Sequence, residues 1–117
     1  MGKLSTHVLD TTRGKPGQGI TIHLSKIINN LSVPILSAVT NQDGRCDQPL
    51  LQGEEFEAAE YQMEFLVGEY FEKFHNDLPN PPFLNKVVIR FNVSNSNENY
   101  HVPLVVTPWS YSTYRGS

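Results

Sequence analysis

The chain has 117 residues, the size of one ordinary domain, and we expect a single domain over residues 1–117. Its net charge is −3 and it has no run of five basic residues, which argues against a nucleic-acid-binding protein. No apolar stretch is long enough to cross a membrane, so we expect no membrane partner either.

Short apolar stretches broken by Gly, Pro, Asn or Asp predict strands and turns along most of the chain. Residues 4–10 form a first candidate strand, in which alternate side chains point to opposite faces. Residues 19–27 and 33–40 predict two more strands. The second of these runs into the sequence NQDGR, where Asp43 and Gly44 are a strong hairpin signal.

The middle of the chain predicts one further strand and the only helix. Residues 60–67 alternate as a strand with one apolar face, made of Tyr61, Met63, Phe65 and Val67. Aromatic residues then recur at helical spacing, at Tyr70, Phe71 and Phe74. They predict one short helix over residues 69–75.

The last third predicts a loop and three strands. Residues 77–83 contain three prolines, which lack an N–H group to donate, so this segment should be a loop. Residues 86–93, 100–107 and 110–115 are strand-like, and Pro103 should lie at a sheet edge or a bulge. Seven or eight short strands and one helix predict an all-β fold, a sandwich of two mainly antiparallel sheets.

Two histidines and one arginine are the candidates for chemistry. His7 lies on the polar face of the first strand, where a solvated side chain is the ordinary interpretation. His101 interrupts an apolar face. It is either a hydrogen-bonded core residue or a group that titrates near neutral pH and activates water. Arg45 follows the turn. It is either a solvated charge or a planar guanidinium that holds a carboxylate or imide edge in two parallel hydrogen bonds.

The remaining reactive residue types offer less. His23 and His75 are expected at the surface, and no two histidines have the spacing of zinc ligands, so we expect no metal. The single cysteine, Cys46, excludes an internal disulfide and favours a reducing compartment, and nothing marks it as an activated nucleophile. The first ten residues lack an apolar signal core, so we expect a cytoplasmic location.

Three stretches together resemble the transthyretin-like 5-hydroxyisourate hydrolases. They are LSTHVLD at 4–10, TNQDGR at 40–45 and YHVPLVVTPWSYSTYRGS at 100–117. The resemblance is collinear over nearly the whole chain, and residues 50–98 match only loosely. The terminal YRGS is the most specific part, because in that family it separates the enzyme of purine degradation from transthyretin, the carrier of thyroid hormone.

The resemblance implies a fold, an assembly and a reaction. The fold would be a two-sheet transthyretin-like sandwich that assembles as a homotetramer, with active sites in a channel between dimers. The reaction would be hydrolytic opening of the six-membered ring of 5-hydroxyisourate, a small molecule formed by urate oxidation. The product would be 2-oxo-4-hydroxy-4-carboxy-5-ureidoimidazoline, and no cofactor would be used.

The resemblance also implies site residues. The implied catalytic residues are His7, Arg45 and His101, and the implied substrate-binding residues are His7, Arg45, Tyr114, Arg115 and Ser117. Either histidine could be the base, and Arg45 could stabilise charge that develops in the transition state. Arg115 could bind substrate or brace the tail, and the carboxylate of Ser117 could pair with a cation. One departure is visible, because Asn99 stands where the family often has histidine.

Two other classes of function compete with a hydrolase. A transthyretin-like carrier would bind a small ligand without catalysis. A structural or adhesion β-sandwich would have no concave cluster that contains both histidines and Arg45.

Overall fold

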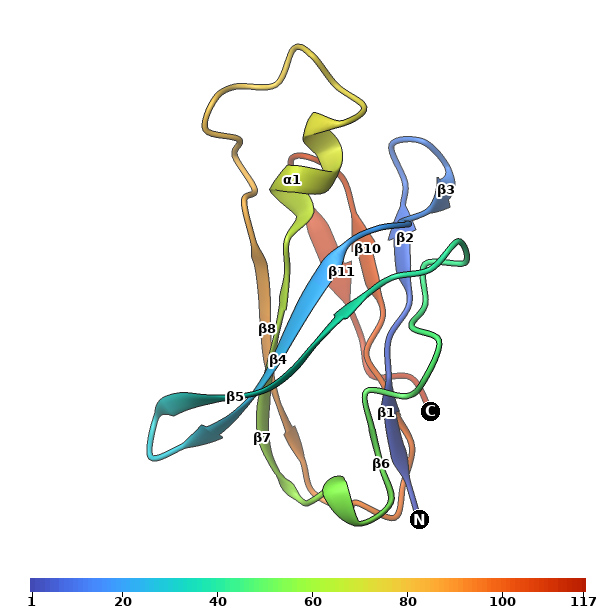
Figure 1. Cartoon of the computed structure of the whole chain (residues 1–117), viewed down its shortest axis with the longest axis vertical. Helices are drawn as coiled ribbons and strands as arrows, with labels where there is room; N and C mark the ends of the chain where they lie inside the picture. Colours follow the sequence, from blue (N-terminus) through green and yellow to red (C-terminus); the bar gives the residue numbers. More distant parts are fainter.

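The computed structural model describes residues 1–117 and consists of two layers of strands with one short helix at one end (Figure 1). Helix α1 spans Val67–Glu72, and a 3₁₀ turn, η1, spans Gly53–Glu55. The strands are β1 (Lys3–Ser5), β2 (Val8–Asp10), β3 (Lys15–Pro16), β4 (Thr21–Ile28), β5 (Leu31–Val39), β6 (Leu51–Gln52), β7 (Ala59–Phe65), β8 (Val87–Val93), β9 (Tyr100–His101), β10 (Leu104–Val106) and β11 (Tyr111–Thr113).

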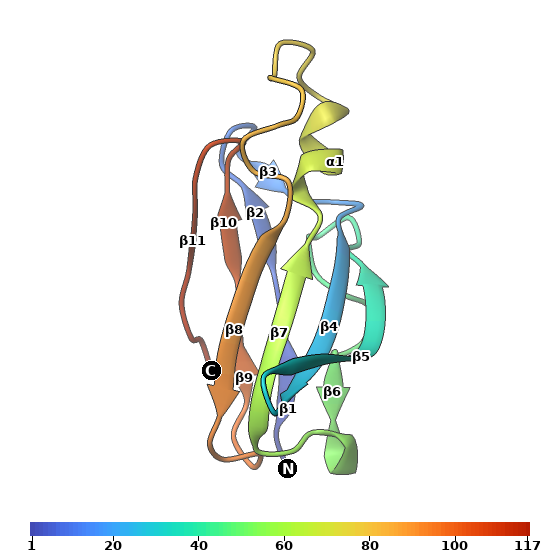
Figure 2. The same ribbon diagram turned by 90° about the vertical axis from the view of Figure 1, so that its left-hand side faces the viewer.

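The first layer is a four-stranded antiparallel sheet in the order β5-β4-β7-β8. The second layer consists of two short sheets, β6-β1-β9 and β11-β10-β2-β3. Figure 2 shows the two layers facing each other. Only β1 with β9 and β2 with β10 pair in parallel. The predicted sandwich of two mainly antiparallel layers with one short helix is therefore confirmed.

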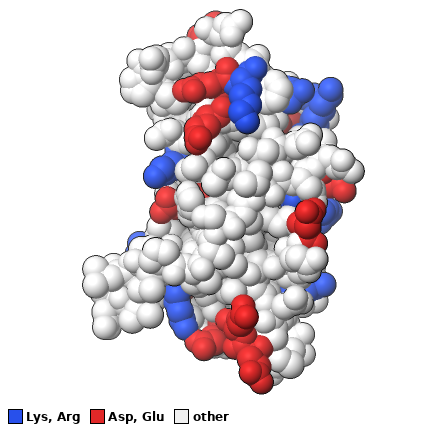
Figure 3. All heavy atoms as spheres, in the orientation of Figure 1, with Lys and Arg blue, Asp and Glu red and all other residues white.

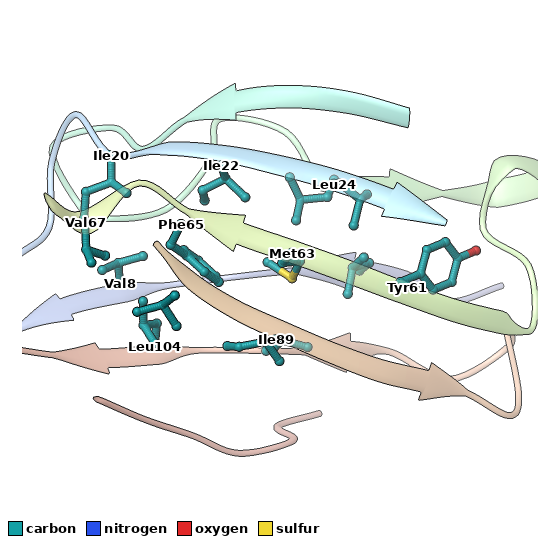
Figure 4. Packing of buried hydrophobic residues seen from close by; sticks show 14 of the residues in the cluster. Val8, Ile20, Ile22, Leu24, Tyr61, Met63, Phe65, Val67, Ile89 and Leu104 are labelled. Carbon is teal, nitrogen blue, oxygen red and sulfur yellow. The ribbon is translucent and has the colours of Figure 1, made fainter. Parts of the chain in front are cut away.

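The core fills the space between the layers with the apolar faces that the alternation predicted. Met63 and Phe65 of β7 pack with Ile22 of β4, against Val8 and Leu104 of the other layer (Figure 4). All five side chains are fully buried. Burying each one stabilises the fold by roughly 1.5–3 kcal/mol. The sheet that carries the candidate residues is thus held on its inner side by a packed core.

The predicted strands over residues 4–10 and 100–107 each divide into two short strands. The two interruptions lie side by side, and pairing continues across them, since Leu104 N donates to His7 O at 2.8 Å. Pro103, which has no N–H to donate, occupies the second interruption. The edge or bulge expected for Pro103 is thus replaced by a break inside the layer, because β10 has β2 and β11 on its two sides.

Two further predictions need small corrections. The helix begins at Val67, two residues before the predicted start, and ends at Glu72. The NQDGR sequence does form a turn, but the residues after it do not pair with β5, so the predicted hairpin is wrong.

Residues 77–83 contain no helix or strand, as predicted. No helix has both the length and the apolar character needed to cross a membrane.

Candidate active site

The turn after β5 brings Arg45 to His7. These two residues form an isolated antiparallel bridge, and Val8 N donates to Gly44 O at 2.8 Å. Gly44 has φ 76°, and a Cβ at this position would lie 2.4 Å from Val8 O. Only glycine fits such a turn. The sequence Asp-Gly-Arg therefore lets the turn pack closely against the segment that joins β1 to β2, with Arg45 beside His7.

Asn41 organises this turn, although the sequence analysis did not single it out. Its Oδ1 accepts hydrogen bonds from Asp43 N at 2.9 Å and Arg45 N at 3.2 Å. Its own N–H donates to Arg45 O at 2.7 Å, and its Nδ2 donates to Asp47 at 2.9 Å. Asparagine two residues before a turn aspartate is the signal that could have revealed it.

His101 is fixed by the parallel pairing of β9 with β1. Ser5 lies opposite His101 in this pairing, and Ser5 Oγ is 2.9 Å from His101 Nδ1. This hydrogen bond occupies Nδ1 and leaves Nε2 available for a ligand or water. The sequence pattern did not reveal this role of Ser5, although Ser5 shares a strand face with His7 at i, i+2 spacing.

The environment keeps the His101 imidazole neutral. Burial lowers its pKa from the usual 6.5, and the positive charges of Arg45 and His7 lower the pKa further. The bridge between His7 and Arg45 and the pairing of β1 with β9 put the three residues on neighbouring segments. The structure thus brings together the three residues that the sequence named as catalytic candidates. A neutral imidazole beside a guanidinium is suited to activate water next to a developing negative charge.

The C-terminal tail returns to this cluster. Gly116 N donates to His101 O at 2.7 Å, and His101 N donates to Gly116 O at 3.3 Å. A Cβ on Gly116 would lie 3.2 Å from His101 Cδ2, so the tail packs closely along the histidine. Thr113 Oγ1 donates to Pro103 O at 2.7 Å and ties the preceding strand to the same segment. The tail is therefore a fixed part of the site.

Arg115 contacts its own chain rather than the histidines. Its Nη2 donates to Asn99 O at 3.0 Å and to Glu98 Oε1 at 3.3 Å. Its guanidinium carbon lies 4.2 Å from the centre of the Tyr100 ring, in a cation–π contact. Of the two roles that the sequence left open for Arg115, these contacts match the brace.

The other two tail residues make no such contacts. Tyr114 is exposed and its hydroxyl forms no hydrogen bond within the chain. It lines a hollow of about 290 Å³ with residues of β8, among them Ile89 and Phe91. Ser117 is exposed. Neither residue is brought to the histidines by contacts within one chain.

The cluster lies on an open surface. A cavity of about 240 Å³ adjoins Arg45 and is lined by Ser5, Thr6 and residues 46–50, but neither His7 nor His101 lines it. Both histidines lie instead on the outer face of the second layer. A single chain therefore supplies the reactive groups but only one wall of a cleft.

The remaining candidates play no part in this cluster. His23 lies on the outer face of the first layer, where Nδ1 is 2.7 Å from Ser37 Oγ. His75 is half-buried and its Nε2 is buried without a partner, so its predicted surface position is wrong. Burial raises the pKa of the Cys46 thiol, which argues against a reactive thiolate. The structure has no group of three possible metal ligands.

Comparison with known proteins now identifies the family. Residues 4–116 match the model of the HIUase/Transthyretin family. The chain belongs to this family. It is 54% identical to the 5-hydroxyisourate hydrolase of Ralstonia nicotianae, over the full length of both chains. It is 50% identical to the 5-hydroxyisourate hydrolase of Pseudomonas aeruginosa, covering all of this chain and 93% of that one.

Solved structures of the HIUase/Transthyretin fold agree. The Klebsiella pneumoniae 5-hydroxyisourate hydrolase superposes with a TM-score of 0.82 at 28% identity, over the whole of both chains. An (S)-allantoin synthase superposes with a TM-score of 0.93 at 42% identity, although this chain spans only 44% of that longer protein. Sea bream transthyretin, at 22% identity and a TM-score of 0.87, shares the fold. The expected transthyretin-like sandwich is thereby confirmed.

Proposed function

We propose that this protein is a 5-hydroxyisourate hydrolase of urate degradation, which opens the six-membered ring to give 2-oxo-4-hydroxy-4-carboxy-5-ureidoimidazoline. The observation that carries the proposal is the cluster of His7, Arg45 and His101, with Gly116 of the tail packed against it. Full-length relatives at 54% and 50% identity bear the name of this enzyme. The carrier alternative has support from the family model, which covers both classes, and from the fold shared with sea bream transthyretin at 22% identity.

His101 is the best candidate for the base. Its Nδ1 is held by Ser5, its backbone is held by Gly116, and its lowered pKa leaves the ring neutral. A neutral Nε2 can take a proton from water as that water attacks the ring carbonyl of the substrate. The departing ring nitrogen then needs a proton, which the imidazolium can return. His7, close enough to influence this pKa, would orient the water or the substrate.

Arg45 is suited to bind the edge of the ring. Its planar guanidinium can donate two parallel hydrogen bonds to an imide or a carboxylate-like edge. The charge on the attacked carbonyl oxygen grows in the transition state, so a donor placed there stabilises the transition state more than the substrate. Asn41 fixes the backbone on both sides of Arg45 and would limit how far the guanidinium moves. Tyr114 and Ser117 would complete the substrate-binding wall.

The direct test of the proposed function is the decay of freshly generated 5-hydroxyisourate, followed by ultraviolet absorbance. Spontaneous opening of the ring gives the background rate. We expect catalytic amounts of the protein to accelerate the decay over many turnovers. A carrier would leave the rate of decay unchanged or slow it in proportion to the bound ligand. Either result would rule out the proposed hydrolase activity.

The pH dependence should report the environment of His101. Because its pKa is lowered, we expect kcat/KM to stay high below pH 6.5 and to fall only as the pH reaches the lowered value. Arg45→Gln removes one of the causes and should move this acid limb upward, toward 6.5, while burial remains. The measurement is kcat/KM from about pH 5 to about pH 8 for both proteins. An acid limb above 6.5 in the wild type would contradict the assignment of His101 as base.

The tail brace can be tested at Glu98. Glu98→Gln weakens the contact with Arg115 and should lower kcat roughly two- to tenfold with little change in KM, because the tail beside His101 loosens. The pair is exposed, so the free energy of unfolding should change by less than about 1 kcal/mol. Glu57→Gln, which breaks the exposed pair with Lys26, is the matched control. A lowered KM would instead indicate that the freed Arg115 binds substrate.

We further propose that the protein is a homotetramer. The strands β8 and β11 are unpaired edges on the same side of the sandwich (Figure 2), and a second copy could extend both sheets there. The outer face around the histidines also exposes the apolar side chain of Leu9. Two different contact surfaces on one chain generate a tetramer of dihedral symmetry, and the second would close the open cleft.

The stretch HVPLVVTPW contributes to this surface only in part. Val102, Leu104 and Val106 are buried in the chain's own core, whereas Trp109 is exposed and remains available to a partner. The free edges, Leu9 and Trp109 carry the argument. Sedimentation velocity at micromolar concentration should give the mass of four chains. A stable monomer would contradict the assembly and would leave the site with one wall.

The lone Cys46 supports the cytoplasm as the cellular compartment of the protein.

A further inference from the structure

A second polar cavity lies at the helical end of the molecule, between the β2–β3 hairpin and α1. Its volume is about 520 Å³, against about 240 Å³ for the cavity beside Arg45. Figure 1 shows the hairpin and the helix next to each other, and Figure 3 shows basic side chains over this region, with acidic side chains beside those near α1. We call this cavity the basic pocket, and the polar residues that define it are Arg13, Lys15, Gln18, Gln42 and Lys73.

The charges of the basic pocket are not balanced from within. Arg13 and Lys15 come from the β2–β3 hairpin and Lys73 from the end of α1, and no carboxylate lines the pocket. The ion pairs of the protein involve Lys26, Lys86 and Arg115, so none of the three pocket cations has one. Lys73 extends toward the loop at Gly19, with its Nζ 3.9 Å from the position of a Cβ there. Three converging cations repel one another unless an anion joins them.

Arg13 is held in place before any ligand arrives. Its guanidinium carbon lies 3.7 Å from the centre of the Phe74 ring, and its Nη1 donates to the Tyr70 hydroxyl at 3.3 Å. That hydroxyl donates to buried Asp10 at 2.7 Å, and burial together with Asp10 raises the Tyr70 pKa to about 12. A fixed guanidinium loses little conformational entropy when it binds a ligand.

Asp10 is the acid that hydrogen-bonds to this arrangement, and both of its oxygens are already engaged. Glu69 and Glu72 of α1 are close to Lys73 in sequence, but neither lines the pocket or forms an ion pair with its cations. One oxygen of Asp10 accepts hydrogen bonds from the backbone of Thr12 and Arg13, and the other accepts from Tyr70. Asp10 balances at most one of the three positive charges. Two positive charges and the side-chain amides of Gln18 and Gln42 therefore remain for a ligand.

We propose that the basic pocket binds a small organic anion through a compact group with two or more negative charges. The shared chemistry is that of a phosphate monoester or a polycarboxylate, since ammonium, guanidinium and amide donors serve both. The pocket has room for the organic part of such a molecule beside the charged group. The basic pocket and the cavity beside Arg45 share no lining residue, although Gln42 of the basic pocket lies in the same turn as Arg45.

Isothermal titration calorimetry on the full-length protein tests the proposal with three probes: pyrophosphate, ribose 5-phosphate and citrate. We expect saturable binding of pyrophosphate at one site per chain, with a dissociation constant below about 1 mM at physiological salt. Saturable binding of ribose 5-phosphate points to phosphate esters as the natural ligands, and saturable binding of citrate points to polycarboxylates. If none of the three probes shows saturable binding, the proposal is wrong.

Variants assign the binding to the pocket. The double variant Lys15→Gln with Lys73→Gln should weaken pyrophosphate binding at least about tenfold, because each charge-assisted contact contributes roughly that much. Lys26→Gln with Lys86→Gln removes the same net charge elsewhere and should change it less than about twofold. Arg45→Ala should bind like the wild type. Equal losses in the two double variants, or loss in Arg45→Ala, would overturn the proposal, and circular dichroism checks that each variant is folded.

Discussion

Replacing His101 by asparagine should lower the turnover of 5-hydroxyisourate by about a hundredfold or more. The imidazole of His101 has a lowered pKa, is oriented by Ser5 and is fixed by Gly116, so its loss removes the acceptor for the water proton. Asparagine is similar in size and polar, so the β1–β9 pairing should persist. The measurement is kcat from initial rates of substrate decay, corrected for the spontaneous reaction, with thermal unfolding to confirm the fold.

His23→Asn provides the matched control for this substitution. His23 is also a half-buried strand histidine with a serine partner, but it lies on the outer face of the opposite layer. We expect its kcat to stay within about twofold of the wild type. His7→Asn and Arg45→Ala should each reduce turnover in the same direction as His101→Asn. If the His23 variant loses as much activity as the His101 variant, the effect is structural and the site assignment is wrong.

Deleting residues 114–117 should abolish measurable turnover while leaving a folded protein. The deletion removes both backbone hydrogen bonds between Gly116 and His101 and the contacts of Arg115 with Glu98 and Tyr100. A displacement of about 1 Å at a catalytic group can cost roughly a hundredfold, and the deletion also removes the wall that Tyr114 would form. No core residue is lost, and β11 keeps its pairing with β10. Substrate decay measures the turnover, near-ultraviolet circular dichroism measures the fold, and sedimentation measures the assembly, which we expect to remain a tetramer.

Gly116→Ala tests whether activity depends on the position of the tail and not only on its presence. The variant retains every other tail atom, but its Cβ would lie 3.2 Å from Cδ2 of His101, so the ring or the tail must shift. We expect a loss of roughly tenfold, between the wild type and the deletion. Full activity in the truncated protein would show that the tail plays no part in catalysis. Loss of the fold in the deletion would show that residues 114–117 are needed for stability.

The sequence predicted the interior of this protein better than its irregular parts. Side-chain alternation placed Tyr61, Met63 and Phe65 on one buried face correctly, because only the apolar face of a strand can be buried against the other layer. The same rule could not locate the interruptions near His7 and Pro103. A strand broken by one missing N–H keeps its alternation, so the pattern reads as continuous across the break.

The sequence predicted the reactive groups of the candidate site but not the residues that orient them. His7, Arg45 and His101 were named, but the serine and asparagine that orient them were not, since Ser5 and Asn41 resemble ordinary strand and turn residues. Their roles depend on partners brought close by the fold: the Ser5–His101 pair spans 96 positions. Such contacts have no local signature in a sequence.

The same long separation affects when the site can form. Strands β1 and β2 have β9 and β10 as their parallel partners, so the layer that carries the candidate site cannot close until both ends of the chain are available. During translation, residues 4–10 must wait with one edge unpaired while about ninety more residues are added, at roughly 5–20 residues per second. The β4–β5 and β7–β8 hairpins need only near neighbours and can form earlier. Catalytic competence should therefore be the last property that a newly made chain acquires, and the exposed apolar edges before that moment are where a chaperone would bind.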